Sequence, residues 1–134
     1  MLVSPLSNGS LRHPKADIVL VEGEIEGSTG NERLLIAPYH MHHSDEEIFY
    51  ILSGRIGFIV SDDEFIASAG DAVLVTPGSV HTWWAASEEP ARYLIAMPQR
   101  MDDLILAIHN DSASYDNMEA LFADYDSTFI GWSR

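Results

Sequence analysis

The sequence predicts an all-β domain, a barrel or sandwich of antiparallel strands, followed by two short α-helices. Short segments rich in β-branched and aromatic residues alternate with turn residues from residue 17 to residue 97. Many short strands at this spacing are typical of a barrel or sandwich. After Pro98 the apolar residues recur every three or four positions, which is the period of a helix.

Eight segments are predicted as strands, because each is apolar and is bounded by turn-forming residues. They are residues 17–21, 33–37, 47–52, 55–60, 64–67, 72–75, 80–85 and 91–97. Residues 1–16 are polar and irregular and are expected to form an N-terminal arm. The barrel is therefore expected to span residues 17–97.

Residues 98–134 are expected to form a helical segment that packs on the barrel or across its mouth. Two stripes with i, i+3, i+4 and i+7 spacing predict the helices. The first consists of Met101, Leu104, Ile105 and Ile108, and the second of Met118, Leu121, Phe122 and Tyr125. Asp116 or Asn117 is expected to cap the second helix.

Composition narrows the class of protein. A chain of 134 residues with 46% hydrophobic residues is long enough for one globular domain with a real core. The formal net charge is −14 with only 7 basic residues, so nucleic acid and anionic membrane surfaces are poor partners. No apolar run is long enough to span a membrane, and the first residues do not resemble a signal peptide. A cytoplasmic location is expected.

The main candidate site contains three histidines and one glutamate. His40 and His42 lie two residues apart, so on a strand both rings point to one face. Glu47 follows after turn-forming residues that can redirect the chain toward the histidines. His81 must arrive from a distant strand. Imidazoles with a carboxylate are typical ligands of a divalent transition metal.

The residues around these positions resemble the two sequence motifs of the cupin superfamily. The first motif is His40-x-His42, four residues, Glu47, six residues and Gly54. The second motif runs from Gly70 through Pro77-Gly78 to His81. This chain departs from the usual pattern at Leu34, Thr76 and Ala85, and none of these departures removes a ligand.

The resemblance implies a double-stranded β-helix, the jelly-roll barrel of cupins. It also implies that His40, His42, Glu47 and His81 bind one divalent ion per chain. Donors of nitrogen and oxygen without sulfur suit Mn, Fe, Co, Ni or Zn, and the sequence does not choose among them. An overlapping alternative is a facial triad of His43, Asp45 and His81. Strand parity disfavours it, because His43 is out of phase with His40 and His42.

Strand alternation predicts which side chains line a pocket beside the metal. If Glu47 points inward, so do Phe49 and Ile51, and if His81 points inward, so do Trp83 and Ala85. These four side chains are the candidate substrate-binding residues. Tyr50 and Trp84 are expected to face the other way, against a helix or a partner subunit.

Two classes of function remain open. The first is a metal-dependent enzyme acting on a small molecule, with Glu47 as the candidate catalytic base. Resemblance to single-domain cupins makes dioxygenase-like chemistry on an aromatic or enol substrate the leading form, with an isomerase or lyase as alternatives. The second class is a non-catalytic module that binds a metal or a small molecule. A homodimer is expected, because small cupins usually pair.

Overall fold

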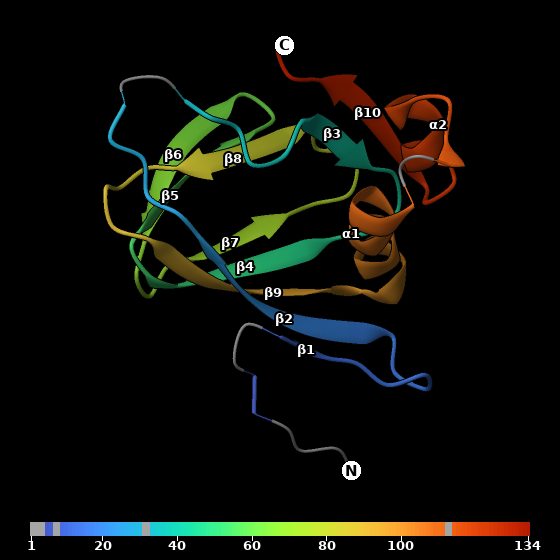
Figure 1. Cartoon of the computed structure of the whole chain (residues 1–134), viewed down its shortest axis with the longest axis horizontal. Coiled ribbons are helices and arrows are strands. Elements are labelled where there is room, and N and C mark those ends of the chain that lie inside the picture. Colours follow the sequence, from blue (N-terminus) through green and yellow to red (C-terminus); the bar gives the residue numbers. More distant parts are fainter. Residues whose placement is uncertain (1–4, 7–8, 31–32, 112–113) are drawn as a thin grey trace.

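The computed structural model describes residues 5–6, 9–30, 33–111 and 114–134. Two five-stranded antiparallel sheets face each other (Figure 1). Sheet A has the order β1 (Ser10–Leu11), β2 (Ile18–Ile25), β9 (Ala91–Pro98), β4 (Glu47–Ser53) and β7 (Ala72–Val75). Sheet B has the order β10 (Ser127–Gly131), β3 (Tyr39–His42), β8 (His81–Ala85), β5 (Arg55–Val60) and β6 (Asp63–Ser68). The predicted all-β double-stranded β-helix is confirmed.

The core lies between the two sheets, and β4 shows how alternation produces it. Glu47, Phe49 and Ile51 are buried, whereas Ile48 and Tyr50 between them are 45% and 42% exposed. The same two-residue period buries Val73 and Val75 of β7, and Ile56 and Phe58 of β5 join the same core. Glu47 is thus a charged residue on an inward-facing position, next to apolar core residues of its own strand.

From β2 to β5, and again from β6 to β10, successive strands alternate between the two sheets, and this crossing brings the two motifs together. β3 ends at His42 in sheet B, and β4 begins at Glu47 in sheet A. Within sheet B, His40 pairs directly with His81 across β3 and β8. The turn before β8 is held in place because the Gly78 N–H donates to the His42 carbonyl at 2.7 Å.

Two helices follow the barrel, as predicted. Helix α1 (Gln99–Asn110) continues directly from β9, and α2 (Met118–Ala123) is capped by Asn117, whose side chain accepts from the Ala120 N–H. Both helices lie at one end of the barrel (Figure 1). A second apolar cluster holds them there, built from Leu104, Leu121 and Phe122 with partly buried neighbours that include Phe129 of β10.

Two segments next to β3 differ from the sequence-based expectation. Residues 33–37 form no regular strand beyond an isolated bridge between Leu35 and Trp84, although the Ile36 N–H donates to the Trp83 carbonyl. The strand starts after Pro38, which has no N–H for a ladder. The second difference is β10, which was not predicted and which adds residues 127–131 to sheet B beside β3.

The N-terminal arm is tied to both the sheet and the helices. β1 pairs with β2, and Arg12 forms ion pairs of 2.6 Å with Asp102 and Asp103 of α1. No helix within the described residues is long and apolar enough to cross a membrane.

The turn between β4 and β5 provides a test of the fold. Gly54 has φ +73°, and a Cβ there would lie 2.7 Å from the Ala91 Cα. We expect Gly54→Ala to lower the free energy of unfolding by roughly 2–4 kcal/mol, since backbone strain and steric overlap add. Gly70→Ala is the matched control, because Gly70 has φ +91° but open space around it. Equal losses for both variants in urea titrations would contradict the close approach at Gly54.

Candidate metal centre

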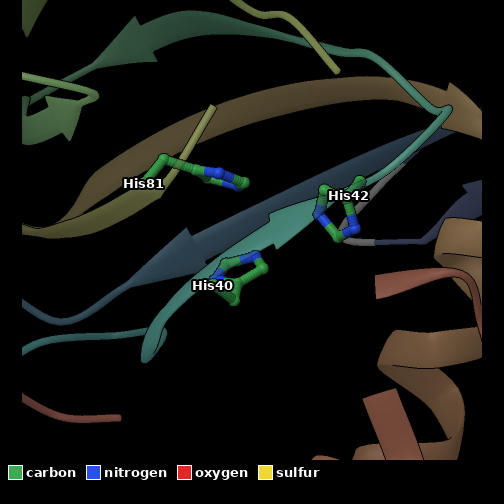
Figure 2. Close-up of side chains that lie close together, drawn as sticks. All are labelled: His40, His42 and His81. Carbon is green, nitrogen blue, oxygen red and sulfur yellow. The ribbon is translucent and has the colours of Figure 1, made fainter. Parts of the chain in front are cut away.

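Three histidine rings converge from two neighbouring strands. Figure 2 shows His40 and His42 on β3 and His81 arriving from β8. One ring nitrogen of each histidine lies within 4.8 Å of the other two, and within the described residues no other group of histidine and acidic side chains meets this spacing. All three side chains are buried. The geometry arises because His-x-His puts two rings on one strand face and His81 is paired with His40.

Hydrogen bonds determine which nitrogen of each ring is available. His40 Nδ1 lies 2.6 Å from the Pro38 carbonyl, and His81 Nδ1 lies 2.9 Å from the Ser79 carbonyl. A carbonyl oxygen only accepts, so both Nδ1 atoms carry a proton and donate it. In a neutral ring, Nε2 then carries no proton, and its lone pair is available to bind a metal. The local turn on the N-terminal side of each histidine therefore orients it for binding through Nε2.

His42 is oriented in the same way, but by a distant residue. Its Nδ1 lies 2.7 Å from the Ser127 hydroxyl on β10. That hydroxyl donates its own proton to the Tyr125 carbonyl at 3.1 Å, so toward His42 it acts as an acceptor. His42 Nδ1 is thus the donor, and the Nε2 atom of this ring also carries no proton and has a free lone pair. Such outer hydrogen bonds fix the tautomer and orientation of metal-binding histidines.

Glu47 faces the histidines from the opposite sheet. Its Oε1 lies 3.0 Å from His81 Nε2 and 3.9 Å from His42 Nε2. Because His81 Nδ1 already holds the ring proton, an ionised carboxylate and an imidazole lone pair would meet at this contact. A cation or an extra proton between them removes the repulsion. The donor set therefore fits a divalent ion held by three imidazole nitrogens and one carboxylate oxygen.

Burial keeps two of the rings in the neutral form that binds metal. Burial, followed by the nearby His81 and His42 rings, lowers the pKa of His40 from 6.5 to about 3. Burial, followed by His81, likewise lowers the pKa of His42 to about 3. Near neutral pH neither ring has to release a proton before it binds a cation, which favours metal uptake.

A cavity of about 290 Å³ lies beside these residues, with His40, His42 and Glu47 on its polar side. The interior of the barrel and the helices provide the rest of its wall. Apolar lining residues include Phe49, Trp83, Tyr93, Ile95, Met97, Met101, Leu104, Ile108, Met118 and Phe122. A metal bound at the histidines would therefore border a mostly apolar chamber.

Comparison with known proteins agrees with this geometry. The family model described as "Cupin domain" matches residues 33–97, which contain both motifs and all four candidate ligands. Residues 33–97 are a cupin domain. No functionally curated protein matches the chain.

Solved structures with the same fold are distant in sequence. A cupin protein from Bacteroides fragilis has a TM-score of 0.58 and 21% identity, over 73% of this chain and 80% of that one. A cupin-2 domain protein from Shewanella frigidimarina has a TM-score of 0.51 and 20% identity, over 64% of this chain and 74% of that one. A putative sugar phosphate isomerase from Acidithiobacillus ferrooxidans has a TM-score of 0.54 and 22% identity, over 63% of this chain and 52% of that one. This chain thus spans about half of that isomerase, and these identities establish the fold alone.

The predicted pocket residues divide into two groups. Phe49 and Trp83 line the cavity, and their rings pack at 5.5 Å between centroids. Ile51 and Ala85 do not line it: Ile51 is fully buried in the core cluster, and Ala85 packs against that cluster. Alternation correctly predicts an inward direction for Ile51, but the cavity ends before it because neighbouring core side chains fill that part of the barrel.

The overlapping triad of His43, Asp45 and His81 is not assembled. His43 is exposed, and its ring nitrogens contact Asp126 Oδ1 at 3.2 Å and the Thr128 hydroxyl at 2.6 Å. Asp45 is held by Arg100 through two hydrogen bonds of 2.8 and 3.0 Å. These residues form a surface network on the outside of the cupin barrel, away from the inward-facing rings.

The two outward aromatic residues also have different environments. Tyr50 is exposed on sheet A, as expected from alternation. Trp84 is only 5% exposed, because Arg33 lies over its ring at 4.3 Å and Gly57 leaves room beside it. Trp84 is therefore covered by its own chain and not available to a partner subunit.

Several residues beyond the cupin match contribute to the site. Ser127 orients His42, the Phe122 ring packs edge-on against His40 at 5.6 Å, and Met118 lines the cavity. The helical stripes in the sequence predicted buried apolar residues at 118 and 122. No local signal marks Ser127, since its partner is 85 residues away.

We expect Ser127→Ala to weaken metal binding about 10–100-fold, because His42 Nδ1 would lose its acceptor and the ring its fixed tautomer. Zinc affinity measured by competition with a chromophoric chelator tests this. Thr128→Ala is the matched control: it also removes a hydroxyl from β10, but one that contacts His43. If both variants keep the parent affinity, Ser127 does not support the metal centre.

Proposed function

We propose that this cupin binds one divalent transition metal through His40, His42, Glu47 and His81 and carries out dioxygenase-like chemistry on a small aromatic or enol molecule. The observation that carries the proposal is the arrangement of the donors: three oriented imidazoles and a carboxylate converge beside an apolar cavity. Such a combination suits a small organic substrate with one metal-coordinating head.

The metal and the chain divide the chemistry between them. A bound iron, manganese or nickel ion would supply Lewis-acid and redox chemistry. Four protein ligands leave up to two places on a six-coordinate ion, so a substrate head can reach it. The apolar wall excludes water from the reacting groups, which strengthens electrostatic interactions there.

Glu47 is the proposed base. It lies at the boundary between the histidines and the cavity, so its carboxylate can both bind the ion and accept a proton from an enol or phenol hydroxyl. Phe49 and Trp83 are proposed to hold the apolar body of the substrate, since both rings line the same chamber. In these roles Glu47 would accept the proton of the reacting hydroxyl, while Phe49 and Trp83 hold the rest of the substrate.

The first test is metal content, measured on protein purified without chelators or affinity nickel. We expect about one divalent ion per parent chain and loss of most of it in His42→Ala. His43→Ala should keep its metal, because His43 belongs to the surface network. Equal loss from both variants would favour the overlapping triad, and no binding under any loading condition would overturn the proposed centre.

Dioxygen consumption with catechols, flavonols and β-diketones tests the reaction type on the same three proteins loaded with Fe(II). Parent and His43→Ala should consume dioxygen with at least one class, and His42→Ala should not. Tight binding of these compounds without turnover would instead identify a non-catalytic binding module. Conversion without dioxygen uptake would identify an isomerase or lyase.

We also propose that the protein forms a homodimer through the outer face of sheet A. An apolar row crosses all five strands, since Leu11 lies opposite Leu20, Leu20 and Ile48 flank Ala96, and Ile48 lies opposite Leu74. Ile48 and Leu74 are 45% and 53% exposed. With a net charge of −14, two copies repel except where such an uncharged face meets another.

Ile48→Glu should convert the dimer to a monomer, because it places like charges opposite each other at the centre of this row. Sedimentation at micromolar concentration measures the change. Ile66→Glu is the matched control, since Ile66 is similarly accessible at 55% but lies on β6 of the other sheet. A parent protein that sediments as a single chain would refute the proposed dimer.

A further inference from the structure

The cavity wall contains no lysine or arginine. All seven basic residues of the chain lie in the described segments, and none of them lines the cavity. Five are held in ion pairs with carboxylates of this chain. The seven are Arg12, Lys15, Arg33, Arg55, Arg92, Arg100 and Arg134. A ligand in the cavity therefore finds no permanently positive side chain.

Arg12 is bonded to a residue of the cavity wall, but its charge is already balanced by carboxylates. Arg12 donates to Asp102, and it is Asp102, buried and at the start of α1, that lines the cavity. A second bond from Arg12 goes to Asp103 on the same helix. The wall thus presents a carboxylate in front of the guanidinium, and the guanidinium hydrogen bonds hold the N-terminal arm to α1.

The ionisable groups that line the wall are acidic or are imidazoles. Glu47 and Asp102 are carboxylates, and His40 and His42 are candidate metal ligands, so neither histidine offers a free cationic partner to a ligand. His109 is exposed, so water screens any charge it acquires. An anionic ligand would lose its hydration without gaining a cationic partner from the chain, so its binding is disfavoured.

We propose that this cavity selects uncharged, mostly apolar ligands and rejects anions of the same size and shape. That the ligand carries a metal-binding head rests on the proposed function, whereas the charge selection follows from the residues of the cavity wall alone. A phosphate ester or carboxylate has no basic side chain to bind here. The substrate class is therefore a phenol, enol or diketone whose body is uncharged, and not a molecule that carries a phosphate or carboxylate away from its metal-binding head.

Two features of the wall suit such a ligand. Phe49, Trp83 and Tyr93 form a group of mutually packed rings, with centroid distances of 5.3 to 6.4 Å, that offers flat aromatic surface. Met97 and Met101 line the adjoining wall with Met118 from α2. Methionine side chains are flexible and polarisable, so this side can adapt to ligands of somewhat different shape.

Matched probes test the selection. Zinc-loaded protein is titrated under nitrogen at about pH 8, where imidazoles are largely neutral, with 4-methylcatechol and with 3,4-dihydroxybenzoate. The two share a metal-binding head and differ by a charge at the far end. Methyl NMR of labelled methionines reports binding, with Met97, Met101 and Met118 as cavity probes and Met41 on β3 as the internal control. We expect about tenfold or greater preference for the neutral probe. Equal or tighter binding of the anion overturns the proposal.

A charge added to the wall should reduce or abolish the preference for the neutral probe. Ile108→Lys places a cation on the lining face of α1, and its affinity for 3,4-dihydroxybenzoate should rise about tenfold relative to 4-methylcatechol. Leu106→Lys is the matched control, because Leu106 lies on the same helix, is 47% exposed and does not line the cavity. Equal responses of the two variants would show that the overall charge, and not the wall, sets the preference, and this also overturns the proposal.

Failure of charge selection and failure of the proposed function can be distinguished experimentally. Loss of every activity with the neutral preference intact would remove the dioxygenase proposal and leave charge selection standing. If the parent binds no metal, the same titration uses 4-methylphenol and 4-hydroxybenzoate, which carry a single hydroxyl and do not chelate. Equal or tighter binding of the anion in that pair would overturn charge selection whatever the fate of the metal centre.

Discussion

The site depends above all on the hydrogen bonds that hold Nδ1 of each histidine. Pro38, Ser79 and Ser127 provide the acceptors, and together they leave three Nε2 lone pairs facing one another and Glu47. Three buried lone pairs beside a carboxylate form an unfavourable arrangement unless a cation or a proton joins them. The same bonds that orient the rings therefore give the apo site its affinity for positive charge, and burial prevents protonation of His40 and His42 from satisfying it near neutral pH.

The segment after the cupin match is part of the site and not an appendage. β10 adds a strand beside β3 and carries Ser127 to His42, while α2 places Phe122 against His40. Helix α1 forms one wall of the cavity and is tied to the N-terminal arm by Arg12. Because these elements pack on the metal side of the barrel, a change in the C-terminal segment can alter both metal affinity and ligand selection without touching a ligand residue.

Charge is distributed so that the interior and the surface serve different purposes. Of the seven basic residues, five hold carboxylates at the surface or between segments, and none faces the cavity. Within the cavity the polar groups gather on the side of the metal centre and at Asp102, and aromatic and methionine side chains cover most of the remainder. A chamber of this composition discriminates by charge and by the position of one coordinating head, more than by many specific hydrogen bonds.

The sequence by itself determined the strand alternation, the two helical stripes and the four candidate ligands, because these depend on local period and on short motifs such as His40-x-His42. It could not place Ser127, since the hydrogen bond to His42 joins residues 85 apart and needs a strand, β10, that no local pattern marked. Nor could it tell where the cavity ends: alternation points Phe49 and Ile51 the same way, yet only Phe49 meets open space. Tertiary packing decides these features, because the direction of a side chain follows from its own strand, whereas the space in front of it follows from all the others.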